Sequence, residues 1–501
     1  MAHVPIEIKN IFAHAKSLDD SPGTPSSSRL TEPDSHTPTI DPAIERHVVR
    51  RCDLRVIPPV FMMFMMTFWD RVNIGNAKIQ GMTTELGLVG NEFNIATMIL
   101  FIPFVLFELP ANFILKKTKP YIWLSFLTFG CGITNLSMGF VDSYGALLGV
   151  RFLLGVFESG IGAGSVMVIA SYYKRYELPT KLSLWYLSGI AGGAFGGLLA
   201  YGIVRMSGDA GLSGWRWIFI VEGSITAFAG ILMYFWMVDW PEACQFLTLD
   251  ERGVLLSRLR ADRLDELRMD RWDTKRLFSD WRIWIGTLMY FSVINSTYST
   301  AFFSPSILQS DMGYTAVKAQ LMSFPPYALA AVGCLSFNML SDRLRHRYGF
   351  IIGGVLIGTI GYAILLAQKE YPNMPVGAKY FALILLVSAP QIVQPLTVAW
   401  MMNNVSGHHK RAFASACQIG FGSAGGIVAS NIYFSTDAPY FRVGYAVSLV
   451  LLLLNGLLAT FLYFALRREN KARADGKRDY LVDGQTTDNL GDDHPDFRFV
   501  Y

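Results

Sequence analysis

Charged residues are scarce in this sequence. Lys, Arg, Asp and Glu make up 16% of the 501 residues, whereas hydrophobic residues make up 52%. Soluble domains carry about a quarter charged residues, so the composition excludes a soluble protein of several domains. The net charge is only +4. Because nucleic-acid-binding proteins need a strong basic excess, this small charge argues against a nucleic-acid partner.

Cysteine and the common catalytic motifs are also sparse. The five cysteines contain neither a Cys-x-x-Cys pair nor the spacing of a metal site; they are Cys52, Cys131, Cys244, Cys334 and Cys417. We therefore expect no disulfide framework and no metal site. A Gly-Lys-Ser/Thr phosphate-binding motif is absent, which argues against an ATP-driven pump. The lack of a paired nucleophile and base predicts that the chain is not an enzyme and uses no cofactor.

The beginning of the chain differs from the rest. Residues 1–49 are polar and rich in Ser, Thr, Pro and Asp, which predicts a disordered tail. They contain no apolar stretch of the length that a cleavable signal peptide needs. We therefore expect the first apolar span to act as its own uncleaved insertion signal.

Apolar runs of membrane length fill most of the remaining chain. A spanning helix needs about 20 mostly apolar residues, and we predict twelve such spans: 55–77, 93–115, 121–141, 145–172, 182–205, 215–238, 282–304, 316–340, 349–368, 377–402, 410–434 and 441–466. The gap at 239–281 contains an amphipathic stretch, Leu247–Asp265, that is typical of a surface helix. The layout predicts an all-α membrane protein with two six-helix bundles, at 50–238 and 282–466.

Basic residues gather in alternate loops between these spans. One set of loops holds clusters such as Lys116, Lys117 and Lys119, whereas the opposite loops hold only scattered single charges. Basic loops stay on the cytosolic side of a membrane. Both tails (1–49 and 467–501) and the central loop are therefore predicted to be cytosolic.

Glycine is concentrated in the fifth span of each half. The clusters consist of Gly189, Gly192, Gly193, Gly196 and Gly197 in the first half and Gly420, Gly422, Gly425 and Gly426 in the second. Small residues let helices approach closely in lipid, and clusters at matching places hint at an internal repeat. Tight packing alone and a surface on which the halves slide are both compatible with the pattern.

Four charged residues interrupt these apolar spans. Asp70 and Arg71 lie in the first span, and Arg151 and Glu158 lie in the fourth, two turns apart on one helical face. A charge at bilayer depth costs roughly 2.5–3.5 kcal/mol even on the insertion scale. Such residues persist where they face a water-filled path, pair with each other or bind a charged substrate. The pattern therefore predicts a transporter.

Several motifs resemble those of a known transporter family. Asn338-Met-Leu-Ser-Asp342-Arg343-Leu-Arg-His-Arg347 is similar to the loop signature Gly-x-x-x-Asp-Arg-x-x-x-Arg of the major facilitator superfamily, with Asn338 in place of the usual Gly. Further segments resemble the fungal allantoate permease family of anion:cation symporters, among them Asp70-Arg71-Val-Asn73-Ile-Gly75-Asn76-Ala77, Glu108-Leu-Pro110-Ala-Asn112 and Gly214-Trp-Arg-Trp.

The resemblance implies a carrier of small carboxylates such as allantoate, nicotinate, pantothenate or biotin, usually driven by protons. It also implies that spans one, four, seven and ten line a central path. The expected partners are a small anionic substrate, protons and the lipid bilayer. We expect a monomer in the plasma membrane, since the family resemblance makes that location the default.

The four charged residues suit this chemistry. An arginine stays charged and offers paired donors that fit a carboxylate, so Arg71 or Arg151 is predicted to hold the substrate. Asp70 or Glu158 is predicted to carry the proton, because its protonation would free an arginine partner for the anion. Two structural alternatives stay open. Asp70 and Arg71 would then form a gating ion pair, and Glu158 would be a buried partner of Arg151.

Polar residues of spans seven and ten are the predicted contacts for the other end of the substrate. They are Asn295, Tyr298, Gln391 and Gln394. Hydrogen bonds that merely link helices account for such residues about equally well.

Further charged residues are expected to serve the structure. Asp342, Arg343 and Arg347 are predicted to form a charge network that stabilises one conformational state. Glu108 is expected to stabilise a helix–loop junction, and Glu222 is expected to be a structural residue of a peripheral helix.

Uptake by proton symport is the preferred prediction, and export of a drug or secondary metabolite is the alternative. Antiporters of that kind usually carry a glycine–proline signature in the fifth span, and residues 188–197 contain no proline. A receptor that signals through its tails is disfavoured, because neither tail contains a recognisable domain.

Overall fold

The computed structural model describes residues 41–174, 177–267, 277–406, 408–481 and 491–501. Residues 1–40 of the predicted tail, 268–276 of the central loop and 482–490 of the C-terminal tail lie outside the described residues. The chain divides into two units, Met1–Pro42 and Ala43–Tyr501, and the second unit holds the helical bundles. The described residues contain helices and no β-strand, which confirms the predicted all-α class.

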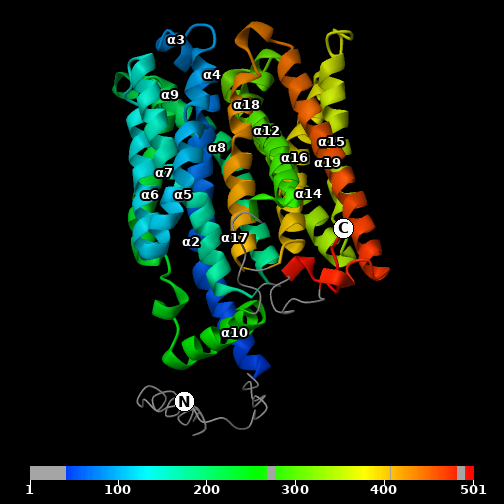
Figure 1. The fold of residues 1–501 in the computed structure, drawn as a ribbon. Coiled ribbons are helices and arrows are strands. Elements are labelled where there is room, and N and C mark those ends of the chain that lie inside the picture. The colour runs from blue at the N-terminus through cyan, green and yellow to red at the C-terminus, as the bar shows by residue number, and fades with distance from the viewer. Residues whose placement is uncertain (1–40, 175–176, 268–276, 407, 482–490) are drawn as a thin grey trace, which may run out of the picture. The chain divides into compact units, whose positions relative to one another are not determined.

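The first bundle covers the first six predicted spans (Figure 1). Its helices are α2 (Pro42–Ala77), α4 (Glu92–Met98), α5 (Phe101–Lys117), α6 (Pro120–Met138), α7 (Tyr144–Tyr172), α8 (Leu178–Ile203) and α9 (Gly214–Trp236). A π-helical turn, Lys78–Met82, joins α2 to the short α3 (Thr83–Glu85). Since α2 begins at Pro42, residues 42–49 are helical, although the sequence placed them in a disordered tail.

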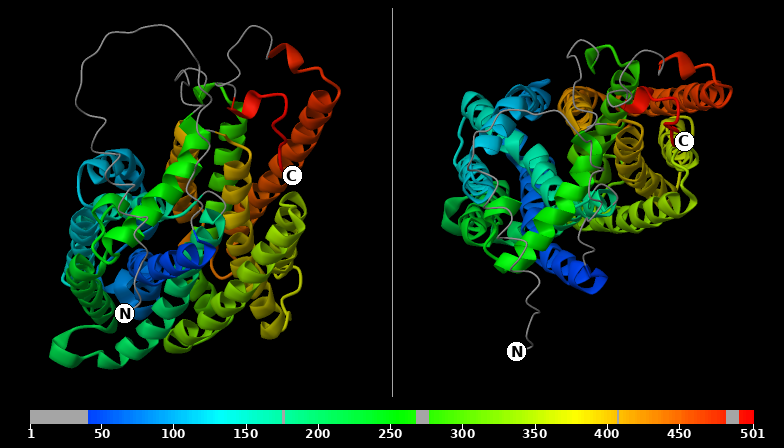
Figure 2. Two further views of the ribbon diagram at one scale, coloured as in Figure 1. Left: turned by 90° about the horizontal axis from the view of Figure 1, so that it is seen from below. Right: turned by 60° about the horizontal axis from the view of Figure 1, so that its bottom comes forward.

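The second bundle covers the other six spans. Its helices are α12 (Trp281–Ser310), α13 (Ala316–Met322), α14 (Phe324–Leu344), α15 (Tyr348–Ala367), α16 (Val376–Asn403), α17 (His408–Ala416), α18 (Gly425–Asn431) and α19 (Arg442–Ala474). The π-helical segment η5 (Cys417–Phe421) connects α17 to α18. Between the bundles, α10 (Leu249–Leu267) confirms the predicted amphipathic helix. Seen from below, the helices of the two bundles lie side by side (Figure 2).

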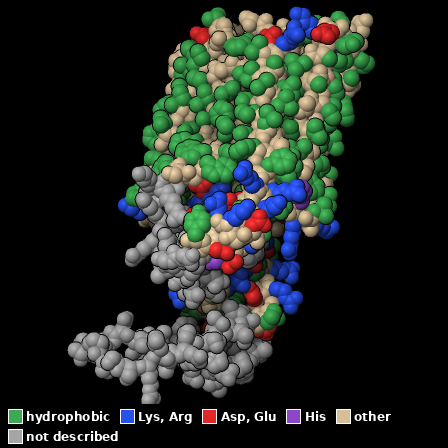
Figure 3. Space-filling view, turned by 45° about the vertical axis from the view of Figure 1, so that its right-hand side comes forward, with side chains coloured by type: hydrophobic (Ala, Val, Ile, Leu, Met, Phe, Trp, Pro, Cys, Tyr) green, Lys and Arg blue, Asp and Glu red, His purple; other side chains and the backbone are tan. Residues whose placement is uncertain are grey.

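Within the described residues, eight helical segments are long and apolar enough to cross a membrane. The other predicted spans correspond to α6, α12, α13 with α14, and α17 with α18. Large apolar side chains such as Leu106, Phe235 and Leu457 stand exposed on these helices. Figure 3 shows a band of hydrophobic side chains between two charged ends on one face. A water-soluble protein rarely exposes such a surface, so the chain is a multi-pass membrane protein.

Helix starts follow from local sequence. The Asp280 carboxylate caps α12 by accepting a hydrogen bond from the backbone N–H of Arg282 (3.0 Å). Ser143 Oγ caps α7 by accepting from Ala146 N at 3.3 Å. Pro120 opens α6, where a missing N–H costs nothing because the first helical N–H groups have no intrahelical partner. These residues fix where the three helices begin.

The two bundles touch at the end opposite α10. Asn94 Nδ2 donates to the carbonyl of Tyr433 at 3.1 Å, and the rings of Phe93 and Phe303 lie 6.3 Å apart. The Lys78 ammonium lies 4.3 Å from the Phe93 ring centroid and 5.4 Å from that of Phe303. The rings of Phe93 and Phe303, one from each bundle, thus both lie near the Lys78 cation at this end.

Part of each glycine cluster lies on the surface between the bundles. A Cβ on Gly193 or Gly197 of α8 would overlap Tyr327 of α14 or Ser323 beside it, respectively. On α18, a Cβ on Gly426 would overlap the ring of Phe101 in α5. These glycines therefore permit close packing across the interface along which the bundles would move.

Backbone contact is closest between α6 and α9 in the first bundle. A Cβ on Gly132 would overlap the backbone nitrogen of Ala227, and a Cβ on Gly223 would overlap that of Leu136. Without a side chain at these positions the two helices pack backbone to backbone, as is common where lipid surrounds a bundle.

The substitution Gly132→Val should therefore destabilise the protein. The added side chain forces α6 and α9 apart, with an expected cost of at least about 1–3 kcal/mol. Thermal unfolding of the detergent-solubilised protein measures this cost. The matched control is Gly149→Val on the exposed face of α7, where an added Cβ meets open space among the described residues. Equal melting temperatures for the two variants would contradict the packing argument.

Candidate functional site

Arg71 on α2 and Glu158 on α7 form a buried ion pair. Arg71 Nε lies 2.6 Å from Glu158 Oε2, and the two residues are 4% and 1% exposed. The second oxygen of the carboxylate, Oε1, has no hydrogen-bond partner among the described residues. Removal of either partner would leave an uncompensated charge in a dry site, which costs several kcal/mol.

Tyr298 of α12 links this pair to the second bundle. Arg71 Nη1 donates a hydrogen bond to the Tyr298 hydroxyl. The guanidinium also lies 4.7 Å from the ring centroid of Phe104, and the Tyr298 ring meets Phe101 edge-on at 4.9 Å. Arg71 is thus enclosed by aromatic rings from both bundles, and the site is closed to solvent in this conformation.

Arg151 does not pair with a carboxylate in the described residues. Its Nε donates to the carbonyl of Ala96 at 3.3 Å, and its Nη1 donates to the carbonyl of Arg71 at 3.4 Å. The partner of Glu158 is therefore Arg71 rather than Arg151. These contacts tie α7 to α4 and to the backbone of α2, so Arg151 positions the helix that carries Arg71.

Asp70 faces away from Arg71. Its Oδ1 accepts a hydrogen bond from Asn135 Nδ2 on α6 at 2.7 Å, and Thr226 on α9 lies beside it. Consecutive residues of an α-helix point about 100° apart, so Asp70 turns into the first bundle while Arg71 turns to the interface. The gating ion pair between these two neighbours, one of the structural alternatives, is not formed.

The predicted substrate contacts in the second bundle differ in whether they bond to neighbouring helices. Asn295 Nδ2 donates to Ser448 Oγ at 3.2 Å. Gln394 Nε2 donates to the Tyr290 hydroxyl at 3.1 Å. These two residues therefore link helices of the second bundle. Gln391 is buried on α16, and its side chain makes no hydrogen bond with any described residue.

Two carboxyl groups that the sequence analysis set aside are deeply buried. Glu108 lies in the interface, where a Cβ on Gly420 of η5 would be 3.3 Å from Oε2; that oxygen has no hydrogen-bond partner in the described part of the chain. Its predicted position at a helix–loop junction is wrong. Glu222 on α9 is fully buried. Both residues interrupt apolar spans, which is the signal that singled out Asp70 and Glu158.

The predicted charge network at the end of α14 is formed in part. Arg347 pairs with Asp342, and Arg347 Nη1 donates to Ser341 Oγ at 3.2 Å. Arg343 is exposed and makes no ion pair with any residue that the structure describes. Two of the three predicted members are therefore in contact.

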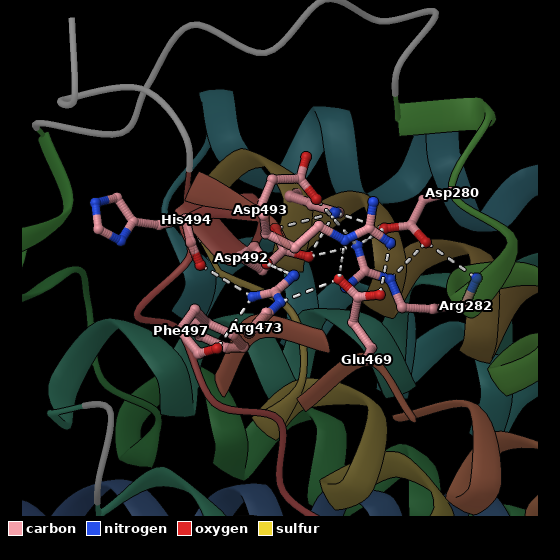
Figure 4. Close-up of polar contacts among 10 residues, drawn as sticks. Asp280, Arg282, Glu469, Arg473, Asp492, Asp493, His494 and Phe497 are labelled. Atoms are coloured by element: carbon pink, nitrogen blue, oxygen red, sulfur yellow. Dashed lines mark hydrogen bonds and ion pairs between the residues drawn. The ribbon is translucent and has the colours of Figure 1, made fainter. Parts of the chain in front are cut away.

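The segment 491–501 packs on the same end of the second bundle. Asn404 at the end of α16 exchanges two hydrogen bonds with the backbone of Val500, at 2.9 and 2.7 Å. Arg473 of α19 donates to the carbonyls of Asp492, His494 and Phe497, each at 3.0 Å (Figure 4). This part of the predicted tail is therefore folded onto the helices.

A dense charge cluster anchors that segment. Lys410 Nζ lies 2.5 Å from Asp280 Oδ2 and 2.8 Å from Asp492 Oδ2. Arg282 Nη2 lies 2.7 Å from Asp280 and 2.6 Å from Asp492 (Figure 4). Burial alone would raise the pKa of Asp280, but the hydrogen bonds and charges of Arg282 and Lys410 outweigh burial and lower that pKa to about 2.

Comparison with known proteins reveals relatives over most of the chain. The family model for the Major Facilitator Superfamily matches residues 60–430. MFS-type transporter cnsO of Penicillium expansum is 32% identical over 477 residues, which cover 91% of either chain. The high-affinity nicotinic acid transporter of Saccharomyces cerevisiae is 28% identical over 476 residues, or 94% of this chain and 88% of the relative. The structure of a D-xylose-proton symporter matches 82% of this chain and 97% of its own, with a TM-score of 0.62 and 16% identity, and so shares the fold.

The cluster around Asp280 gives a pH-dependent prediction. The pKa of Asp280 is lowered from its ordinary value of 3.8 to about 2, so its charge stabilises the folded state by about 2 kcal/mol above pH 4. That contribution is lost as the pH falls from about 4 toward 2. Asp280→Asn should therefore melt at a lower temperature than the parent at pH 7, and the gap should narrow below pH 4.

Thermal unfolding between pH 7 and pH 3 tests this expectation. Asp475→Asn is the matched control, because Asp475 forms only a long, exposed pair with Lys477 (3.8 Å), and such pairs contribute little. A gap between the Asp280 variant and the parent that stays constant down to pH 3 would contradict the prediction.

Proposed function

The chain belongs to the Major Facilitator Superfamily, and we propose that it is a secondary active transporter that imports a small organic anion with protons. The observation that carries this proposal is the buried Arg71–Glu158 pair with Tyr298 of the second bundle. A fixed cation at the meeting point of two bundles, neutralised by one carboxylate, suits reversible anion binding. The fungal allantoate permease branch is the proposed subfamily.

Competition for Arg71 couples the anion to the proton. While Glu158 is ionised it occupies the guanidinium. Once Glu158 gains a proton, the guanidinium is left with a hydroxyl group as neighbour, and a carboxylate substrate forms the stronger, paired hydrogen bonds. Proton loss restores the ion pair and expels the anion. Asp70 is the second proposed proton carrier, and Arg151 holds the backbone of Arg71 in place.

The arrangement of contacts suits alternating access. Asn94, Phe93 and Lys78 join the bundles at the end opposite α10. At the α10 end, the ion pairs of the described residues stay within one bundle or join α10 to the first, as with Arg51 and Glu251. With the basic loops and both tails in the cytosol, as we propose, this conformation is closed to the outside.

The substrate is proposed to be a monocarboxylate or a vitamin-like anion. The yeast relative that is 28% identical is a nicotinic acid transporter, and nicotinic acid carries one carboxyl group on a flat ring. Aromatic side chains around Arg71 would stack on such a ring. Gln391 is the best placed of the predicted amides for the opposite end of the substrate, since it bonds to no described residue. The plasma membrane is the proposed location, with the monomer as the working unit.

Uptake of labelled carboxylates, including nicotinate, tests the proposal in transporter-deficient cells at acidic and neutral pH. The parent should accumulate one of them faster at acidic pH. Arg71→Lys should reduce that uptake by about 10–100-fold, because a charge-assisted paired contact contributes about 1.5–3 kcal/mol. Glu158→Gln should reduce the stimulation by acid, because the carboxyl group that competes for Arg71 is lost.

Arg205→Lys is the control, since Arg205 is an exposed arginine outside the site. Uptake that survives Arg71→Lys at the parental rate would refute the proposed anion site. Accumulation below that of cells without the protein, reversed by Glu158→Gln, would instead identify an exporter.

A further inference from the structure

A second group of buried polar side chains lies in the first bundle, on the side of α2 that faces away from Arg71. It consists of Asp70 on α2, Asn135 on α6, and Glu222 and Thr226 on α9, and we call it the carboxyl cluster. All four residues are at most 1% exposed. The Arg71–Glu158 pair does not include any of them.

The close packing of α6 on α9 builds this cluster. Gly132 and Gly223 let the two backbones touch, which brings Asn135, one turn after Gly132, next to Glu222. Thr226 follows Glu222 by one turn on α9, and its Oγ1 accepts a hydrogen bond from Trp69 Nε1 of α2 at 3.4 Å. Three helices therefore fix the positions of the two carboxyl groups.

The oxygens of the cluster are short of donors. Neither carboxyl oxygen of Glu222 has a hydrogen-bond partner in the described residues. Asp70 Oδ2 and Asn135 Oδ1 make no hydrogen bond of ordinary geometry with the described chain either, although the Thr226 hydroxyl and the Trp69 indole lie close to the Asp70 carboxyl group. Asn135 Nδ2 satisfies Asp70 Oδ1 alone. The orphaned oxygens belong to buried residues of three packed helices, α2, α6 and α9.

No described cation compensates the two carboxyl groups. Asp70 is the one charged group that acts on Glu222. The other titratable groups that face Asp70 are Glu158 on α7 and Cys131 on α6, and either would add negative charge. Arg71, the nearest guanidinium along α2, is turned to Glu158 and Tyr298.

An unpaired charge in such a site is costly. The penalty for burying one ionised carboxylate is several kcal/mol even after relaxation, and two carboxylates in one dry enclosure are not both charged. An O–H bond on one carboxyl group removes one of the two charges. The carboxyl cluster thus has the geometry of a site that holds a proton while it is closed to water. The site releases the proton once water enters.

We propose that Asp70 and Glu222 together bind a coupling proton, in addition to the proton that Glu158 exchanges, with Glu222 as a proton-binding residue and with Asn135 and Thr226 as positioning residues. The inference rests on the proposed function, since it concerns the protons of that transport cycle. It places this proton site apart from the anion site at Arg71. Because Asp70 and Arg71 are consecutive on α2, a movement of α2 that hydrates the cluster also shifts Arg71 relative to Glu158 and Tyr298.

Proteoliposomes that contain the full chain test this assignment with the carboxylate found by the uptake screen. One assay measures accumulation driven by a pH difference of about one unit, which is worth about tenfold per coupled proton. The other measures exchange of labelled for unlabelled substrate without a gradient. Glu222→Gln should lower accumulation about tenfold and leave exchange within about twofold of the parent. Asp70→Asn should likewise lower accumulation about tenfold.

Ser224→Ala is the control on the same helix, because Ser224 is exposed and bonds only to the carbonyl of Ile220. If Glu222→Gln fails to reach the membrane, Glu222→Asp replaces it. That variant keeps a carboxyl group on a shorter side chain, and its accumulation should show a shifted pH dependence with normal exchange.

Parental accumulation in Glu222→Gln, or a parental pH profile in Glu222→Asp, would overturn the inference. Accumulation that follows a sodium gradient in place of the pH gradient would also overturn it, because the cluster would then bind a metal cation. A parent protein without acid-driven accumulation would refute the proposed function itself, so the two failures are distinguishable.

Discussion

The cationic side chain of Arg71 has to be compensated in a region without water, and the centre of the molecule is organised around that need. Glu158 neutralises the charge, Tyr298 accepts a further hydrogen bond, and Phe104 offers its ring face. Because Tyr298 belongs to the second bundle, the compensation also holds the bundles together. Any rearrangement that parts them must supply Arg71 with another partner, and an anionic substrate is such a partner.

Charged residues near the ends of the helices differ from those in the core in how completely they are paired. At the α10 end, Asp280, Lys410 and Asp492 pair fully with neighbours, and the pairing lowers the pKa of Asp280. Those charges fasten segments to one another. In the core, carboxyl oxygens of Glu158 and Glu222 lack partners among the described residues. Incomplete pairing is expensive for stability, so it indicates chemistry rather than architecture.

The fold could be predicted from the sequence because a membrane span needs a fixed length of apolar residues. The lengths of the apolar stretches alone predicted the spans that α2 to α19 form. Breaks within spans could not be predicted in this way. The separation of α4 from α5, and the π-helical segment between α17 and α18, depend on how neighbouring helices pack. The helical start of α2 at Pro42 was missed because residues 42–49 are polar and look like the tail before them.

The candidate site could be predicted as a set of residues but not as a set of contacts. Asp70, Arg71, Arg151 and Glu158 stood out because charges are rare in apolar spans. Their partners depend on the rotation of each helix about its axis, which the sequence does not specify. Arg151 therefore turned out to bind backbone carbonyls.

Glu222 gave the same signal as Asp70 and was set aside because its helix was expected to be peripheral. The Gly132 and Gly223 contacts pack α9 closely on α6, and Glu222 is buried although other side chains of α9, such as Phe235, stay exposed. One turn of α2 thereby places Asp70 in the carboxyl cluster and Arg71 beside Glu158 and Tyr298. In the proposed cycle this helix couples the proton to the anion, since a movement of α2 displaces both residues.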